Sequence, residues 1–135
     1  DLNRHQNLLK IQPVYQHSFF SLRSFFQRTL SLGPRIVVVT DGGHGIYLAT
    51  KERMYFHPAL KVDEIINTLG AGDAFGSSFC GAIYAGENIG QAIRYGLINS
   101  ASVIRYHDSK TGLLDRETIA SKIAELPDMM STIEW

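Results

Sequence analysis

The spacing of apolar residues early in the chain predicts a helix followed by a buried strand. Apolar side chains recur at helical spacing between Ser18 and Leu32, so they would share one face of a helix. Ser18 is a suitable N-cap for this helix, and the pair Gly33-Pro34 is suited to end it. Residues 36–40 are a continuous β-branched run, which is typical of a strand buried on both faces of a parallel sheet. A helix followed by such a strand indicates the α/β class.

The segment after this strand has the alternating pattern of half-buried strands. Residues 46–50 and 53–57 alternate in character, and the polar pair Lys51-Glu52 lies between them. A period of two that is interrupted by a short polar turn predicts a β-hairpin or meander at the edge of the sheet.

Helical spacing returns in three later segments. The first runs from about residue 72 to 85 and is closed by Gly86. The second begins after Asn88, a favourable N-cap, and continues to about residue 106. The third begins after a capping Asp115 and ends before Pro127. The residues beyond Pro127 have no informative pattern.

Composition narrows the function without identifying it. Of the 135 residues, 44% are hydrophobic and 19% are charged, which is ordinary for a globular domain with a core. Thirteen basic and thirteen acidic residues cancel, so we expect no nucleic-acid or membrane surface, and any anion binding must be local. No apolar run approaches the ~20 residues of a membrane span, and no signal peptide opens the chain, so a cytoplasmic protein is expected. Cys80 has apolar neighbours, which predicts a buried structural thiol rather than a reactive one.

The most informative stretch opens the first of the late helices. Its residues are Asn67-Thr68-Leu69-Gly70-Ala71-Gly72-Asp73. Two glycines one residue apart permit a tight turn with outward N–H groups, and the following helix adds free amides and the positive end of its dipole. Such a turn predicts an anion site, and phosphate is the commonest anion of that size. Asp73 is then either an ordinary helix-start acid or a general base beside a phosphoryl group.

Residues 68–75 resemble the signature of the ribokinase-like (PfkB) carbohydrate kinases, written D-T-x-G-A-G-D. The resemblance implies a three-layer α/β/α fold in which Gly70, Ala71 and Gly72 form an anion hole for the transferred phosphoryl group. It also implies that Asp73 is the catalytic base. The first Asp of the signature is Asn67 here, at a position near the phosphate and cation environment of the family.

The resemblance extends to a glycine-rich loop at the end of the β-branched run. Thr40, Gly42 and Gly45 match the T-x-G-x-x-G pattern that contacts the phosphates and ribose of ATP in the family. The loop also suits an ordinary hairpin turn, and this second interpretation stays open. Asp41 and His44 are expected to be loop residues without a role in the site.

Further nucleotide-binding positions are implied nearer the C-terminus. Thr68 belongs to this set, and Asn99 lies where the family has an Asn near the adenine and monovalent-ion region. Asn99 either approaches the base or is an amide on the helix surface, and the turn at Gly112 would border adenine. Near the N-terminus, Asn3 and Gln6 fall where the family often has N-x-x-E, whose residues help to organise magnesium.

The function implied by the resemblance is ATP-dependent phosphoryl transfer to a hydroxyl of a sugar or nucleoside. Mg²⁺ would be required, and a monovalent cation is a further candidate. Residues 1–135 would be a single domain or fragment that holds the C-terminal ATP-binding portion, with the N-terminal substrate and lid portion absent. The alternative is a non-catalytic nucleotide-binding module or an inactive kinase fragment. A third hypothesis is a fragment that forms a homodimer and so covers an exposed sheet edge.

Overall fold

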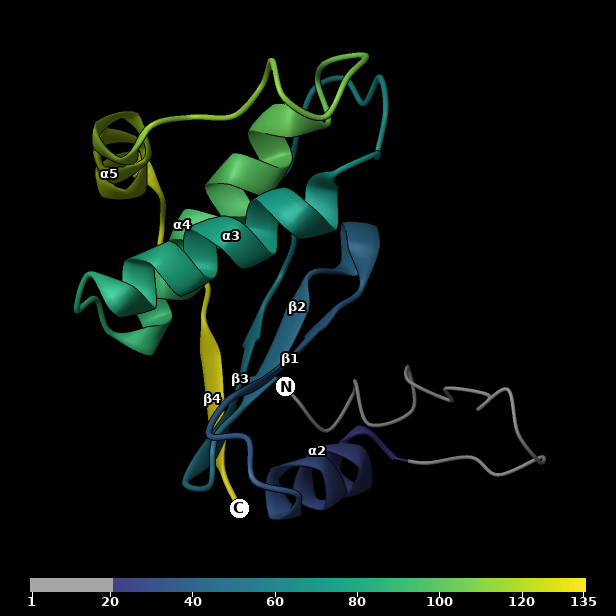
Figure 1. The fold of residues 1–135 in the computed structure, drawn as a ribbon, viewed down its shortest axis with the longest axis vertical. Coiled ribbons are helices and arrows are strands. Elements are labelled where there is room, and N and C mark those ends of the chain that lie inside the picture. Colours follow the sequence, from purple (N-terminus) through teal and green to yellow (C-terminus); the bar gives the residue numbers. More distant parts are fainter. Residues whose placement is uncertain (1–20) are drawn as a thin grey trace, which may run out of the picture. The chain divides into compact units, whose positions relative to one another are not determined.

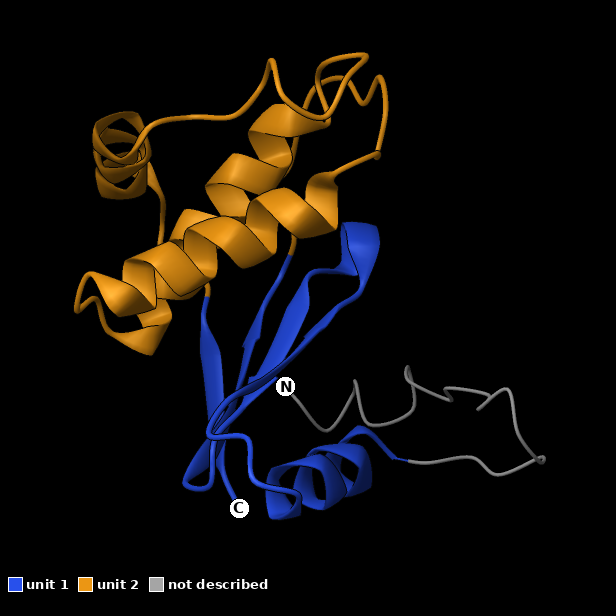
Figure 2. Ribbon diagram, in the orientation of Figure 1, with its two compact units in different colours: residues 1–58, 130–135 blue, residues 59–129 orange. Residues whose placement is uncertain are grey.

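The computed structural model describes residues 21–135, which form two compact units (Figure 2). The first unit contains the described residues up to 58 together with residues 130–135, and the second contains residues 59–129. The first unit is therefore built from both ends of the described chain.

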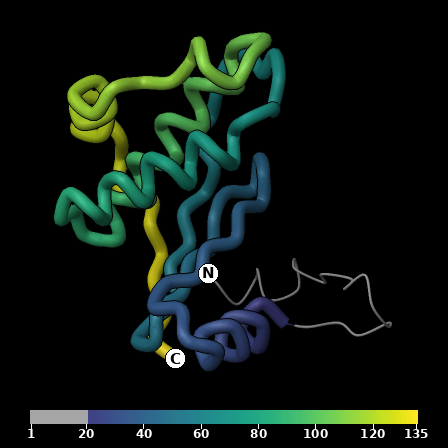
Figure 3. The backbone as a smooth tube through the Cα atoms, in the orientation of Figure 1, coloured from purple at the N-terminus to yellow at the C-terminus, as the bar shows by residue number. Residues whose placement is uncertain are grey.

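A four-stranded antiparallel sheet forms the centre of the first unit (Figure 1). Its strands, in order across the sheet, are β1 (Val37–Thr40), β2 (Ile46–Ala49), β3 (Arg53–His57) and β4 (Ser131–Glu134). The register pairs Val38 with Leu48 and Leu48 with Tyr55. The predicted meander over residues 46–57 is confirmed, and its path can be followed in Figure 3. Its predicted place at the edge of the sheet is wrong, because β1 and β4 flank β2 and β3.

The strand predicted to be buried is not the one that the structure buries. The β-branched run 36–40 predicts a strand covered on both faces of a parallel sheet. In the described chain, however, β1 pairs only with β2, in the antiparallel sense, and it is half-buried with Thr40 exposed. All four residues of β2 are buried instead. The difference in burial follows from the order of the strands, because β1 is an edge strand here whereas β2 has a strand on each side. Strand propensity does not decide whether a strand lies at the edge or inside a sheet.

Helix α2 (Leu22–Ser31) packs on this sheet through its apolar stripe. The shared core consists of Leu22, Phe26 and Leu30 with Tyr47, Ala49, Met54 and Phe56. The N-cap is Ser21, whose Oγ accepts a hydrogen bond from the N–H of Ser24 at 3.1 Å. The predicted cap, Ser18, lies outside the described residues, while the predicted stop is confirmed by Gly33, which follows the helix with φ 122°.

The last residue of the chain holds β4 in this unit. Trp135 donates from Nε1 to the carbonyl oxygen of Thr50 at 2.8 Å, and its ring packs against the α2 core. The guanidinium of Arg23 lies 5.6 Å from the ring centroid, which is within the range of a cation–π interaction. Sequence pattern did not reveal β4, because its partner β3 is distant in sequence.

Three helices make up most of the second unit: α3 (Ala71–Tyr84), α4 (Ile89–Val103) and α5 (Arg116–Glu125). Helices α3 and α4 approach each other closely, since a Cβ added at Gly96 would lie 2.6 Å from the ring of Phe75. All three lie close to their predicted positions, although α4 ends at Val103, before the predicted residue 106.

The predicted N-caps of α4 and α5 are confirmed. The side-chain oxygen of Asn88 accepts from the N–H of Gln91 at 2.9 Å, and that of Asp115 accepts from Thr118 at 2.7 Å. These bonds satisfy N–H groups that have no partner inside a helix. The helix starts in this unit are therefore set by local sequence.

Cys80 is exposed on α3, so the prediction of a buried thiol is wrong. The buried face of α3 consists of Ala74, Phe75, Phe79 and Ala82. These positions follow the helical period, and residue 80 does not fall among them. None of the described helices is both long and apolar enough to cross a membrane.

Candidate functional site

Residues 68–71 form a tight turn immediately before α3. The N–H of Ala71 donates to the carbonyl of Thr68 at 3.3 Å, and Gly70 has φ 81° and ψ −2°. These angles are those of the third residue of a type II turn, a position that favours glycine. A Cβ at Gly70 would also lie 2.5 Å from the Cβ of Ser109. Glycine is therefore required at 70 by both the backbone conformation and the contact.

The N-terminus of α3 differs from those of α2, α4 and α5. Each of those helices is capped by a side-chain oxygen, whereas Gly70 gives α3 no side-chain cap. Within the described residues, the N–H groups of Gly72 and Asp73 have no acceptor, and the first amide bonded into the helix is that of Ala74, which donates to Gly70 at 2.8 Å. Free amides at the positive end of a helix dipole can bind an anion.

The side-chain positions next to these amides are open. Asp73 is exposed in the first turn of α3, where a carboxylate interacts favourably with the helix dipole. Gly72 is also exposed, and a Cβ added to it would meet nothing within 4 Å. The fold therefore does not demand glycine at 72, and its absence of a side chain leaves the backbone accessible to a ligand. Both interpretations of Asp73 are compatible with this geometry.

Asn67 connects the turn to the loop that follows α4. Its Oδ1 accepts from the N–H of Leu69 at 2.9 Å, and its Nδ2 donates to the carbonyl oxygen of His107 at 3.0 Å. The backbone N–H groups of Ile66 and Asn67 both donate to the carbonyl oxygen of Ile104, at 2.9 and 3.2 Å. The residue that departs from the kinase signature thus makes contacts with both ends of its amide.

Asn99 lies in the interior of the second unit. It is 4% exposed, its Nδ2 donates to Oγ of Ser78 at 2.6 Å, and its Oδ1 accepts from the N–H of Leu114 at 2.9 Å. The helix-surface interpretation of Asn99 is therefore wrong. A contact with a nucleotide base, the other interpretation, would depend on the second Nδ2 hydrogen or the second lone pair of Oδ1.

The turn at Gly112 lies against the end of α4. A Cβ on Gly112 would lie 2.7 Å from the Cα of Val103, so only glycine fits. Asp108 orders the same turn by accepting hydrogen bonds from the hydroxyl and N–H of Thr111 and from the N–H of Lys110, at 2.7, 2.8 and 2.7 Å. These bonds, the hydroxyl of Thr111 foremost, lower the pKa of Asp108 to about 2.

The remaining predicted nucleotide contacts lie in the first unit, in the loop that joins β1 to β2. Thr40 ends β1, Gly42 begins the short 3₁₀ helix η1 (Gly42–His44), and Gly45 follows with φ 120°. The N–H of Asp41 donates to the carbonyl of Gly45 at 2.8 Å, and that of His44 donates to Asp41 at 2.9 Å. The hairpin interpretation is confirmed, because the loop connects antiparallel neighbours.

Within the second unit the structure brings two predicted groups together. The turn at Gly70 faces Ser109, and Asn67 reaches His107, so the loop that leads to Gly112 lies beside the anion turn. His107 and Ser109 were not candidates from sequence. Their contacts join positions that are 40 residues apart in the case of Asn67 and His107, and no local pattern indicates such a pairing.

Comparison with known proteins decides the family. The sequence profile of the pfkB family carbohydrate kinase matches residues 22–116. The chain belongs to this family. The matched range includes the α3 turn and the glycine loop of the first unit, so both motifs lie within the pfkB homology.

Two curated relatives are similar to this chain over part of their length. A 5-dehydro-2-deoxygluconokinase of Listeria monocytogenes is 30% identical over 90 residues, which is 67% of this chain and 28% of the relative. An ATP-dependent 6-phosphofructokinase of Thermoanaerobacterium thermosaccharolyticum is 33% identical over 95 residues, or 70% of this chain and 29% of the relative. The chain thus spans less than a third of these relatives.

The fold is that of the same family. A crystal structure of a putative ribokinase II from E. coli, in complex with ATP and Mg²⁺, matches 82% of this chain and 35% of its own with a TM-score of 0.72 at 20% identity. The predicted ribokinase-like α/β class is therefore confirmed for the part of the fold that this chain forms.

The family implies a magnesium ion, so the side chains that could act as its ligands are of interest. In the described part of the chain, no three His, Cys, Asp or Glu side chains gather as a metal site. Mg²⁺ usually keeps several waters and binds through substrate phosphates and one or two carboxylates. Asp73 is an exposed carboxylate beside the free amides of α3, and a carboxylate is a donor of the kind that Mg²⁺ accepts. Asn3 and Gln6 lie outside the described residues.

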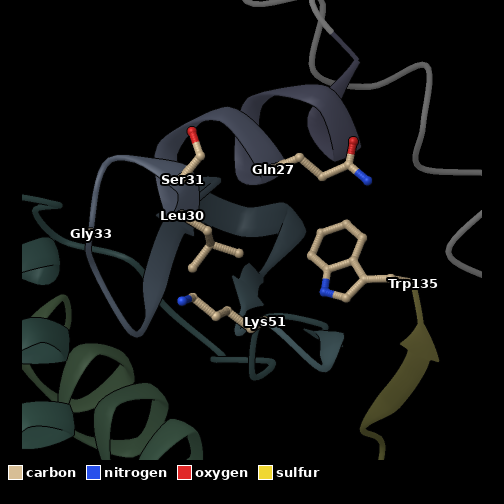
Figure 4. Close-up of a pocket in the computed structure, with 6 residues that line it drawn as sticks. All are labelled: Gln27, Leu30, Ser31, Gly33, Lys51 and Trp135. Carbon is tan, nitrogen blue, oxygen red and sulfur yellow. The ribbon is translucent and has the colours of Figure 1, made fainter.

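One pocket of the first unit is lined by none of these residues. It occupies about 460 Å³ in the first unit and is lined by Gln27, Leu30, Ser31, Gly33, Lys51 and Trp135 (Figure 4). None of its lining residues belongs to the glycine loop, and none matches a family motif. The candidate functional site is therefore based on the free amides of α3 rather than on this pocket.

Proposed function

We propose that this chain carries the ATP-binding portion of a kinase that phosphorylates a hydroxyl of a sugar or nucleoside. The observation that carries the proposal is the uncapped start of α3, where two free amides adjoin Asp73 in a chain of the pfkB family. Support comes from the relatives, which are named as a 5-dehydro-2-deoxygluconokinase and an ATP-dependent 6-phosphofructokinase, and from the structural neighbour crystallised with ATP and Mg²⁺.

In the proposed reaction, the substrate hydroxyl oxygen attacks the γ-phosphorus of ATP. A new oxygen–phosphorus bond forms, the bond to the bridging oxygen breaks, and ADP leaves. The carboxylate of Asp73 accepts the hydroxyl proton late in this step, when bonding to phosphorus has made the hydroxyl acidic. The N–H groups of Gly72 and Asp73 stabilise negative charge on the phosphoryl oxygens. Mg²⁺ bound to the ATP phosphates would neutralise part of their charge.

The other site residues keep the roles that the family implies, as predictions. Thr68, Asn99 and Gly112 are proposed nucleotide contacts of the second unit, and Thr40, Gly42 and Gly45 are proposed contacts of the first. Groups that select the sugar are proposed to lie in the part of the relatives that this chain does not span. A cytoplasmic location also remains a prediction.

Calorimetric titration of the chain with magnesium-ATP tests the nucleotide site. We expect binding that Gly72→Val weakens at least about tenfold, because its side chain would enter the open space beside the free amides. The melting temperature should stay within about 2 °C of the wild type, since valine and glycine have similar helix propensities and the fold leaves room for a side chain.

Gly81→Val is the matched control. Gly81 is also an exposed glycine of α3 with nothing within 4 Å of an added Cβ, but it lies near the other end of the helix. Equal weakening by both variants would argue against the anion site. A folded chain that binds no magnesium-ATP would overturn the proposal in favour of the inactive-fragment alternative. Size-exclusion chromatography of the same sample tests the homodimer.

A further inference from the structure

Asn67 makes a contact that a signature aspartate could not make. Its Nδ2 donates a hydrogen bond to the carbonyl oxygen of His107, while its Oδ1 accepts from the N–H of Leu69. The two partners fix the orientation of the amide, because a carbonyl must face a donor and an N–H must face an acceptor. The side chain is half-buried at this place.

A carboxylate at position 67 would change only one of these bonds. Its oxygen could still accept from Leu69, but its second oxygen would face the His107 carbonyl, whose distance from Nδ2 is now 3.0 Å. Two acceptor oxygens at this separation repel each other unless a cation or a donated hydrogen lies between them. The amide supplies that hydrogen itself.

The donor set at Asn67 therefore does not fit the monovalent cation that the kinase resemblance implies for this region. A cation needs oxygen lone pairs directed at it, and hard cations are bound by such oxygens. Here the His107 carbonyl oxygen accepts a hydrogen bond from the Asn67 amide, and an N–H group cannot act as a ligand of a cation.

Further contacts hold the anion turn (residues 68–71) against the loop after α4. The N–H groups of Ile66 and Asn67 donate to the Ile104 carbonyl, and Gly70 leaves no space for a side chain next to Ser109. Loss of the hydrogen bond between Asn67 and His107 should therefore alter the turn that presents the free amides of α3.

We propose that the Asn67 amide makes the anion turn independent of a monovalent cation, by forming directly the link to His107 for which a carboxylate would need a bridging cation or hydrogen-bond donor. The consequence for nucleotide binding rests on the proposed function. The consequence for the stability of the turn does not, since it follows from the two hydrogen bonds alone.

Thermal unfolding of the full chain tests this inference in potassium, sodium and tetramethylammonium chloride at equal ionic strength. We expect the wild-type melting temperature to agree within about 1 °C across the three salts. Asn67→Asp should melt about 2–5 °C lower in tetramethylammonium, and potassium or sodium should restore at least about half of the loss. Asn67→Ala is the matched control, because it loses both hydrogen bonds without adding charge and should show no recovery in any salt.

Three results would overturn the inference. The first is a wild-type melting temperature that is several degrees higher in potassium or sodium than in tetramethylammonium. The second is an Asn67→Asp melting temperature equal to that of the wild type in tetramethylammonium. The third is a lowered Asn67→Asp melting temperature that neither potassium nor sodium raises. If the variants do not fold, amide hydrogen exchange of residues 66–72 in the wild type decides, since equal protection in the three salts is expected and cation-specific protection contradicts it.

Titration of the wild type with magnesium-ATP in the same salts separates this inference from the proposed function. We expect dissociation constants that agree within about twofold. An absence of ATP binding would count against the proposed function alone, because the unfolding result still judges the role of Asn67. Binding that requires potassium or sodium would count against cation independence while supporting the nucleotide site.

Discussion

The two glycine-rich turns of this chain differ in the helix that follows their free backbone N–H groups. In the loop between β1 and β2, the amides of Asp41, His44 and Gly45 all donate to carbonyls within the loop. At the start of α3, the amides of Gly72 and Asp73 donate to no acceptor among the described residues. Glycine content is similar in the two turns, so it does not by itself indicate an anion site. The N–H groups of Gly42 and Gly43 also have no acceptor among the described residues, but they begin a 3₁₀ helix of three residues. The free amides of the second turn are distinguished by their place at the start of α3, a helix of 14 residues whose dipole favours an anion there.

Three glycines of these turns differ in how strongly the fold requires glycine at their positions. Gly42 has φ 49° in open space, so its backbone conformation alone favours glycine. Gly70 has φ 81° and also faces Ser109 at a distance that excludes a side chain. Gly72 is helical and open, so the fold has no need of glycine there. Substitution at each position therefore tests a different property of the two turns.

The largest expected effect is on phosphoryl transfer at the turn that precedes α3, called the open turn below. Asp73→Asn should lower phosphoryl transfer by roughly 10²–10⁴-fold, the usual contribution of a general base, in a protein that contains this chain and phosphorylates a sugar. Binding of magnesium-ATP should persist, because the free amides are backbone groups. Single-turnover conversion of ATP to ADP measures the first quantity and calorimetry the second.

Asp63→Asn is the control for this prediction. Asp63 is an exposed carboxylate of the same unit and is expected to be an ordinary solvated charge. It should leave both quantities unchanged. Turnover of the Asp73→Asn protein close to that of the wild type would mean that Asp73 is only a helix-start acid.

The next effect concerns the shape of the open turn. Gly70→Ala should lower the free energy of unfolding by about 2–4 kcal/mol, because it combines a positive φ with overlap against Ser109. Gly72→Ala should instead be neutral or raise that free energy by up to about 1 kcal/mol, since alanine is the better helix former. Urea unfolding of the two variants measures the difference. Similar losses for both would contradict the distinct roles of the two glycines.

The smallest effect is expected in the loop between β1 and β2 of the first unit. Gly42→Ala should lower the free energy of unfolding by about 1 kcal/mol, because only the positive φ opposes a side chain there. Urea unfolding measures this value, and Gly43→Ala is the control, since an added Cβ at Gly43 also meets nothing and no positive φ is present. A loss as large as that of Gly70→Ala would mean that the loop has packing constraints like those of the α3 turn.

Local sequence determined much of this molecule. The caps at Asn88 and Asp115, the meander over residues 46–57 and the glycine turn before α3 all follow from residues within a few positions of one another. Helix starts and tight turns are short-range structures, since their hydrogen bonds close over two to four residues. The signature around Gly70 is local for the same reason, and it was sufficient to indicate the family.

Tertiary structure decided the features that depend on partners distant in sequence. The β-branched run became a half-buried edge strand because only β2 pairs with it in the described chain, and β4 exists because β3 offers a partner. Asn99 became an interior link because Ser78 and Leu114 meet it there. Burial and long-range hydrogen bonds depend on which surfaces come together, and the periodicity of a single segment carries no information about its neighbours.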